Sequence, residues 1–336
     1  MRRDPSIPTG EIRSIYLDSP RLESNMLGDP TRRRVDLYIP HGHDGAGLPL
    51  LVDLVGYTSG GPKHTNWLNF GENVPERADR LIASGEMPPV VIAFPDCFTR
   101  LGGNQYINSR AMGDWADWLT QDMLPAIETQ FGCGGAGRRG VFGKSSGGYG
   151  ALVHGMLYAN TWSAIASHSG DVGFDLMLAT DFAHTLRRLD KHGGSVERFI
   201  AAFEAADTVR GDDLHALMIL GLAATYDPDP DSYLGIRLPV TMDTCERIEA
   251  RWDQWLAWDP LNLIESHAEA VKSLKCVYID CGDADQYNLL YGARRLTRRL
   301  SAMGITHVYE EFAGTHSSVD FRMDVSLPLL ARALSA

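Results

Sequence analysis

Runs of apolar and β-branched residues, each bounded by Gly, Pro or Asp, recur along most of the chain and predict β-strands. Several of them, such as residues 50–52 and 90–94, are continuously apolar rather than alternating, which is typical of strands covered by helices on both faces. The pattern therefore predicts a mainly parallel sheet. The predicted strands are Arg34–Ile39, Leu48–Val55, Val90–Phe94, Gly140–Phe142, Trp162–Ser167, Cys276–Ile279 and Thr306–Phe312.

Apolar positions at helical spacing lie between these runs and predict helices that connect the strands. The predicted helices are Trp115–Phe131, Gly147–Ala159, Leu289–Met303 and Val325–Leu334. Because strand and helix alternate, the predicted fold class is α/β, with a doubly wound parallel sheet flanked by helices. We expect residues 1–336 to form a single domain.

Residues 171–274 break this alternation, because they contain helical patterns and no convincing buried strand. The patterns cover Asp181–Leu189, Val196–Ala206, Asp213–Ala224 and Cys245–Trp258. We therefore expect a mostly helical insertion that folds over the functional site as a cap. Trp252, Trp255 and Trp258 recur at intervals of three and share one side of a helix in it. They either pack the insertion onto the body, as helical aromatic stripes usually do, or form an aromatic wall that binds substrate.

Charge and composition exclude several classes of protein. The formal net charge of the chain is −12, and such a surface repels phosphate backbones and anionic headgroups, so we expect no nucleic-acid partner. No run approaches the roughly 18 apolar residues of a membrane span, and the N-terminus has Asp4, Pro5 and Pro8 in place of the apolar stretch of a signal peptide. Five cysteines without paired C-x-x-C spacing favour a reducing compartment. We expect a cytoplasmic protein with no membrane partner. Whether the chain forms a homo-oligomer stays open.

The segment Gly143-Lys144-Ser145-Ser146-Gly147-Gly148 matches G-x-S-x-G, between a predicted strand and a predicted helix. This is the context of a nucleophile elbow, in which a serine sits on a strained turn and small neighbours let the helix pack close to the sheet. If the G-x-S-x-G motif were centred on Ser146, it would need glycine at the position of Lys144. Ser145 is therefore the predicted nucleophile. The helix N-terminus offers free N–H groups to a developing oxyanion.

A serine nucleophile needs a base, and in this fold the chain order is Ser, then Asp or Glu, then His. The strand Cys276–Ile279 runs into a turn that contains Asp280, Asp283 and Asp285, and the strand Thr306–Phe312 runs into Gly314-Thr315-His316. His316 is the predicted base, and Asp285 is the carboxylate that holds its productive tautomer.

The second oxyanion donor should come from the loop after Leu48–Val55, where Gly56-Tyr57-Thr58-Ser59-Gly60-Gly61 stands. The backbone N–H groups of Tyr57 and Ser146 are the predicted pair. No metal or cofactor is expected. The pair His41 and His43 has no third and fourth ligand at usable spacing, and Gly135-Ala136-Gly137-Arg138-Arg139-Gly140 follows a helix and precedes a strand, the reverse of a dinucleotide fingerprint.

These motifs resemble the putative esterase family of α/β-hydrolases, which includes S-formylglutathione hydrolases, feruloyl and acetylxylan esterases, enterobactin esterases and mycolyltransferases. The resemblance covers most of the chain outside the insertion. It implies an α/β-hydrolase fold with Ser145, Asp285 and His316 as the catalytic triad. Lys144 and Ser146 depart from the family pattern, which usually has His, Leu or Phe before the nucleophile and Met, Gln or Phe after it. The segments that carry the resemblance are residues 35–40, 54–58, 106–109, 122–128, 143–152, 281–285 and 314–316.

The sequence thus predicts a serine carboxylic-ester hydrolase that acts through an acyl-enzyme on a small-molecule ester or thioester. Two alternatives stay open. An acyltransferase would hand the same acyl-enzyme to an alcohol or sugar, and acceptor binding rather than the triad distinguishes it. A non-catalytic binding protein with a hydrolase fold would not need the three candidates in this chain order.

Overall fold

The computed structural model describes residues 4–178 and 180–336. Residues 1–3 of the N-terminal stretch considered above lie outside the described residues. The main sheet has eight strands in the order β1-β2-β4-β3-β7-β8-β9-β10, and a separate pair, β5 (Asn108–Ser109) and β6 (Gly113–Asp114), lies outside it. The strands of the main sheet are β1 (Glu11–Leu17), β2 (Arg33–Ile39), β3 (Leu50–Leu54), β4 (Val91–Pro95), β7 (Arg139–Lys144), β8 (Ala164–His168), β9 (Cys276–Gly282) and β10 (Val308–Phe312).

Neighbouring strands from β4 to β10 pair in parallel, whereas β1 and β2 form an antiparallel edge. The carboxyl ends of the parallel strands therefore meet at one edge of the sheet. Twelve α-helices accompany the strands within the described residues. They are α1 (Val74–Ala83), α2 (Trp115–Asp117), α3 (Leu124–Phe131), α4 (Ser146–Leu157), α5 (Phe174–Met177), α6 (Asp181–Asp190), α7 (Val196–Glu204), α8 (Gly211–Tyr226), α9 (Glu249–Leu256), α10 (Pro260–Lys272), α11 (Leu289–Ala302) and α12 (Met323–Ser335).

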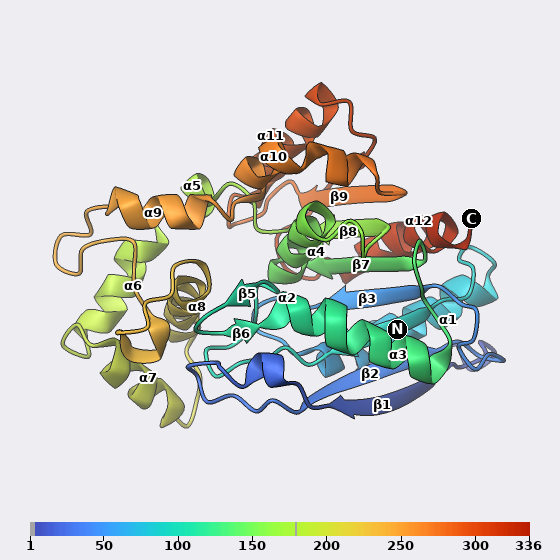
Figure 1. The fold of residues 1–336 in the computed structure, drawn as a ribbon, viewed down its shortest axis with the longest axis horizontal. Helices are drawn as coiled ribbons and strands as arrows, with labels where there is room; N and C mark the ends of the chain where they lie inside the picture. Colours follow the sequence, from blue (N-terminus) through green and yellow to red (C-terminus); the bar gives the residue numbers. More distant parts are fainter. Residues whose placement is uncertain (1–3, 179) are drawn as a thin grey trace.

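Helices cover both faces of the sheet and enclose a separate apolar core on each (Figure 1). α1 and α12 pack on one face, and α3, α4, α10 and α11 pack on the other. Alternate residues of the central strands point to opposite cores: Leu51 belongs to the core under α1 and α12, whereas Leu50 and Val52 belong to the core under α4. This arrangement explains why the central strands read as continuously apolar.

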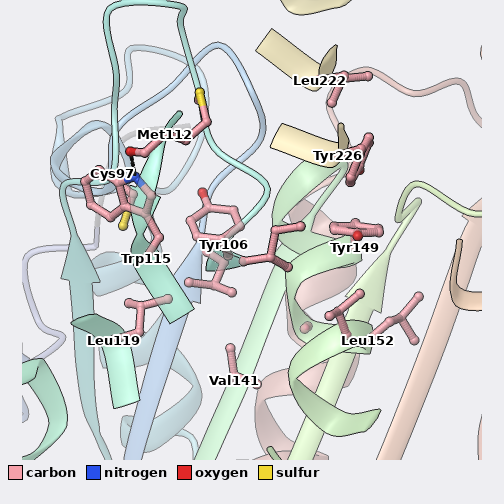
Figure 2. Close-up of a cluster of buried hydrophobic side chains, with 14 of the residues drawn as sticks. Cys97, Tyr106, Met112, Trp115, Leu119, Val141, Tyr149, Leu152, Leu222 and Tyr226 are labelled. Atoms are coloured by element: carbon pink, nitrogen blue, oxygen red, sulfur yellow. Dashed lines mark hydrogen bonds between the residues drawn. The ribbon is translucent and has the colours of Figure 1, made fainter. Parts of the chain in front are cut away.

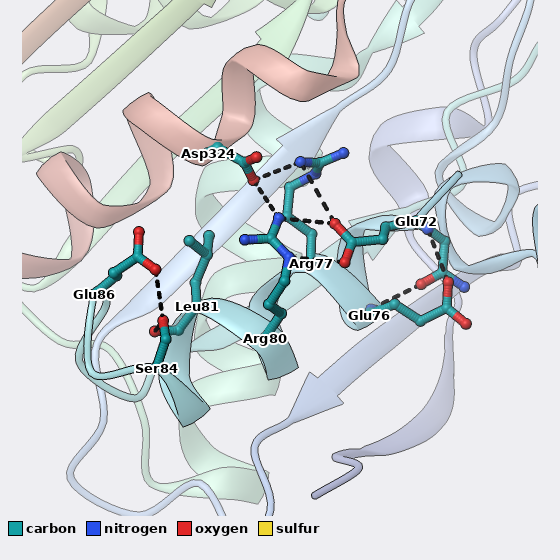
Figure 3. A network of polar contacts seen from close by, with 9 residues as sticks. Glu72, Glu76, Arg77, Arg80, Leu81, Ser84, Glu86 and Asp324 are labelled. Atoms are coloured by element: carbon teal, nitrogen blue, oxygen red, sulfur yellow. Dashed lines mark hydrogen bonds and ion pairs between the residues drawn. The ribbon is translucent and has the colours of Figure 1, made fainter. Parts of the chain in front are cut away.

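A network of ion pairs joins α1 to α12 (Figure 3). Asp324 of α12 accepts hydrogen bonds from Arg77 and Arg80 of α1, and Arg80 also binds both carboxylate oxygens of Glu72 at 2.8 Å. These contacts fix the start of α12, which directly follows the loop after β10. The ends of that loop are therefore held by the sheet on one side and by a charged network on the other.

Residues 171–274 hold helices α5 to α10 and, in the part that the structure describes, add no strand to the sheet. Aromatic side chains join this segment to α4. The ring of Tyr149 in α4 lies 5.9 Å from that of Tyr226 in α8, in the buried cluster of Figure 2. The Tyr149 hydroxyl also donates to the carbonyl oxygen of Trp258 at 3.1 Å. The insertion and the body thus share one continuous core.

The fold class predicted from the sequence is confirmed, and the seven predicted strands all occur in the sheet. The antiparallel edge strand β1 and the helices α1, α5 and α10 were not predicted. No helix within the described residues has the length and apolar character needed to cross a membrane.

Candidate active site

Ser145 lies on a sharp turn between β7 and α4, at the carboxyl edge of the sheet. Its backbone adopts φ 56° and ψ −124°, a conformation that costs free energy for any residue with a side chain. Hydrogen bonds on both sides hold it there: its N–H donates to the carbonyl of His168 at 3.0 Å, and its carbonyl accepts from the N–H of Tyr149 at 2.9 Å. The strain predicted from the G-x-S-x-G motif is therefore present in the backbone.

The glycines around Ser145 leave no room for side chains. A Cβ atom on Gly143 would lie 2.2 Å from the carbonyl oxygen of Leu54, and one on Gly147 would lie 1.7 Å from that same atom. A Cβ atom on Gly148 would lie 2.9 Å from the Cα of Gly170. The first turn of α4 thus packs directly against the backbone of the sheet, which is the reason for the glycines in the motif.

His316 follows β10, and its imidazole is held by a carboxylate from the neighbouring strand end. The distance from His316 Nδ1 to Asp285 Oδ2 is 2.8 Å. The Asp285 side chain is fully buried, and its other oxygen accepts a hydrogen bond from the backbone N–H of Tyr287 at 2.9 Å. The ring of Tyr287 stands edge-on to the His316 imidazole, with 4.9 Å between the ring centres. His316 is thus fixed in both position and orientation.

The other two carboxylates of this strand end have different partners. Asp280 is buried and binds Nδ1 of His168 at 2.9 Å and Nε of Arg322 at 2.9 Å. Burial alone would raise the pKa of Asp280, but His168 and these hydrogen bonds lower it below its ordinary value. Asp283 is exposed and accepts a hydrogen bond from the backbone N–H of Gly314 at 3.0 Å. Of the three, Asp285 is the one that reaches His316.

Ser145, His316 and Tyr57 line one cavity of about 300 Å³. Tyr57 is buried and its hydroxyl donates to the carbonyl of Leu101 at 2.7 Å, which anchors the loop that follows β3. Within the described residues the backbone N–H of Tyr57 makes no hydrogen bond. Ser146 is the first residue of α4, so its N–H has no partner within the helix. Both donors proposed for an oxyanion are therefore available beside Ser145.

A family model described as Putative esterase matches residues 24–327, most of the chain. The chain belongs to this esterase family. Membership makes the protein a carboxylic ester hydrolase, as the motifs around Ser145 and His316 predicted. A search of curated proteins gave no match.

Solved structures of esterases share the fold of this esterase at low sequence identity. A ferulic acid esterase aligns with a TM-score of 0.62 and 18% identity, over 97% of this chain and 99% of the other. An S-formylglutathione hydrolase from Agrobacterium tumefaciens aligns with a TM-score of 0.61 and 16% identity, over 99% of both chains. FphF of Staphylococcus aureus, a fluorophosphonate-binding serine hydrolase, aligns with a TM-score of 0.59 and 13% identity, over 96% of this chain and 99% of the other. At these identities the likeness establishes the fold.

Sequence reasoning missed a second histidine of the esterase cavity, His64, and its partner Asp53. Asp53 is buried within β3, and its Oδ2 lies 2.6 Å from Nδ1 of His64. Burial alone would lower the pKa of His64, but the Asp53 carboxylate raises it above its ordinary value. His64, Ser59 and Lys144 also line an adjoining cavity of about 230 Å³, so they stand between the two spaces.

Asp171 is another cavity residue that the sequence analysis did not identify. It follows β8 at the same edge of the sheet as Ser145. Asp171 could have been identified from its position shortly after the predicted parallel strand Trp162–Ser167, because the carboxyl ends of such strands meet at the site.

The structure does not bring the three predicted tryptophans to the cavity wall of the esterase. Trp252 and Trp255 are buried, and the ring of each forms a T-shaped pair with that of Phe182 in α6, at centroid distances of 5.8 and 5.5 Å. Trp258 is partly buried against the same core. None of the three is among the residues that line the catalytic cavity in the described part of the chain. Trp252 and Trp255 pack α9 against α6 and α8, whereas Trp258 lies beyond the end of α9, so the three do not share one helix as predicted.

Replacing Trp255 with alanine is expected to lower the free energy of unfolding of the esterase by about 3–5 kcal/mol, because it removes a fully buried ring from this core. The ranking of p-nitrophenyl esters of increasing chain length by kcat/KM should stay the same. Trp67→Ala is the control, since that ring is 72% exposed and its loss should barely change the unfolding temperature. A changed ranking in Trp255→Ala would show that the stripe shapes the substrate pocket.

Proposed function

We propose that the protein is a serine esterase that hydrolyses small-molecule esters or thioesters through an acyl-enzyme. The observation that carries the proposal is the meeting of three strand ends at one cavity: the strained elbow of Ser145, the His316 imidazole and, behind it, the buried Asp285. Among the described residues that line the cavity, no other histidine follows the nucleophile in the chain order of this fold. Family membership and the fold of the solved esterases support the same function.

In the first half of the reaction, Ser145 Oγ attacks the ester carbonyl while its proton passes to Nε2 of His316. Asp285 stabilises the imidazolium that forms, because its Oδ2 accepts the hydrogen bond from Nδ1. The backbone N–H groups of Tyr57 and Ser146 bind the oxygen on which negative charge develops. The leaving alcohol or thiol takes the proton from His316, and the acyl group stays on Ser145.

In the second half, water enters the cavity and His316 removes its proton as it attacks the acyl-enzyme. The acid leaves and the proton returns to Ser145, so neither a metal nor a cofactor takes part in any of these steps. Because Asp285 Oδ2 accepts a hydrogen bond from Nδ1 of His316, it keeps the imidazole proton on Nδ1 in the resting enzyme, which leaves Nε2 free to accept the proton of Ser145.

Mass spectrometry of the intact protein tests this function. After brief incubation with p-nitrophenyl butyrate and an acid quench, the mass should rise by one butyryl group, and a fluorophosphonate should block that change. p-Nitrophenol should appear in a burst of about one equivalent if deacylation is slow. An enzyme that turns over only when an alcohol acceptor is added would instead be an acyltransferase. A protein that neither hydrolyses the ester nor reacts with fluorophosphonate would contradict the proposal.

A further inference from the structure

Asp171 places a buried carboxylate on the wall of the catalytic cavity. The residue is 3% exposed, and one of its oxygens, Oδ2, accepts hydrogen bonds from Gln105 Nε2 at 3.2 Å and Ser146 Oγ at 3.3 Å. Within residues 4–178 and 180–336, no hydrogen bond reaches the other oxygen, Oδ1, and no lysine or arginine forms an ion pair with Asp171. One oxygen is therefore used by the protein, and the other has no protein donor.

The cavity wall around Asp171 has mixed character. Met177, Met218 and Leu289 contribute apolar side chains and His316 and Tyr287 polar ones, but within the described residues none of them donates a hydrogen bond to Oδ1. Burial raises the pKa of Asp171 to about 6, against the opposing effects of the hydrogen bond from Gln105 and of the nearby His316 imidazole. The side chain is consequently ionised in weakly alkaline solution, and a buried charge is costly unless a partner binds it.

A purely structural role does not account for the charge. An asparagine would also accept hydrogen bonds from Gln105 and Ser146 through its carbonyl oxygen. The carboxylate moreover lies beside Ser146, whose N–H is a proposed oxyanion donor. Its negative charge favours the imidazolium of His316 but opposes the charge that develops on the oxyanion. A substrate group that neutralises Asp171 removes this penalty, and a substrate without one does not.

We propose that Asp171 is a specificity-determining residue that binds a hydroxyl or ammonium group of the ester. The preferred substrates are then esters that carry a hydrogen-bond donor a few bonds from the scissile carbonyl, in either the acyl or the alcohol part. At this buried carboxylate such a bond to a charged acceptor is stronger than its counterpart in water. This inference rests on the proposed function, since it concerns the substrate of the same site.

Esters that differ in a single group test the inference. On the acyl side, p-nitrophenyl esters of butanoate, 3-hydroxypropanoate and 3-aminopropanoate present a methyl, hydroxyl or ammonium group at the same position. On the alcohol side, propyl butyrate and 2-hydroxyethyl butyrate form the equivalent pair. The kcat/KM of each is measured at pH 8, where Asp171 is ionised, for the wild type and for Asp171→Asn.

In one of the two series, the wild type should prefer the donor-bearing ester over its methyl counterpart, and Asp171→Asn should reduce that preference by about 10- to 100-fold. The series in which this occurs identifies the part of the substrate that Asp171 contacts. Because each ratio is measured within one protein sample, partial unfolding of the variant lowers both rates and leaves the ratio intact. Asp227→Asn is the matched control: Asp227 is a largely buried aspartate at the end of α8 that pairs with Arg237 outside the cavity, and its loss should leave all ratios unchanged.

The possible failures are distinguishable. If the wild type hydrolyses the methyl esters and shows the same ratios as Asp171→Asn in both series, Asp171 does not select the substrate, and the proposed esterase function still stands. If no ester is hydrolysed and fluorophosphonate does not label the protein, the proposed function fails and this inference fails with it.

Discussion

Replacing Ser145 with alanine is expected to lower kcat by about five to six powers of ten, because without its Oγ no acyl-enzyme can form. Labelling by a fluorophosphonate should be lost completely. The elbow geometry favours Ser145 over the adjacent Ser146, since of these two serines only Ser145 has the strained φ of 56° and lines the cavity. The rate of p-nitrophenyl butyrate hydrolysis and the mass of the labelled protein together measure the effect.

Ser146→Ala is the matched control for the same experiment. The Ser146 hydroxyl is buried and engaged with Gln105 and Asp171, so it does not face the ester, and alanine keeps the backbone N–H that we propose as an oxyanion donor. This variant should therefore still react with fluorophosphonate. Labelling that persists in Ser145→Ala and disappears in Ser146→Ala would identify Ser146 as the nucleophile and contradict the alignment of the G-x-S-x-G motif on Ser145.

The central sheet could be predicted because its strands are buried on both faces, and short apolar runs between turn residues are typical of such strands. The edge strand β1 gives a weaker signal. Its sequence Glu-Ile-Arg-Ser-Ile-Tyr-Leu is largely exposed, so few of its residues are constrained to be apolar. α1 was missed although its start carries a capping box, in which the side chains of Asn73 and Glu76 each accept from the other's backbone N–H. Attention to caps would have found that helix.

The site was predictable to the extent that its chemistry is local in the sequence. The elbow motif and the two turns that hold Asp285 and His316 each follow a strand, and parallel strands bring their ends together. Asp171 and the pair of His64 with Asp53 have no motif, because their role depends on which side chains the fold leaves facing the cavity. The tryptophan stripe shows the opposite case, in which a regular pattern reflects packing within the insertion.

Asp285→Asn is expected to reduce kcat by about 10³- to 10⁴-fold with little change in the fold. The asparagine amide has the same size as the aspartate carboxylate. Its oxygen can still accept the hydrogen bond from the backbone N–H of Tyr287, which Asp285 accepts at 2.9 Å. Its NH₂ group would then face Nδ1 of His316 and donate to it, so the imidazole proton would move to Nε2. His316 could then no longer accept the proton of Ser145.

Asp283→Asn separates this effect from a general disturbance of the turn. Asp283 is exposed and holds the backbone N–H of Gly314, a contact that the amide oxygen of asparagine can keep, so the loss in kcat should be several-fold at most. Rates of p-nitrophenyl butyrate hydrolysis over a range of pH, with thermal unfolding of each variant as the check on structure, give the comparison. Asp285 lies 2.8 Å from the imidazole nitrogen of His316, whereas Asp283 binds the neighbouring backbone. Equal losses of kcat in the two variants would therefore mean that Asp285 acts through the shape of the turn and not through the tautomer of His316.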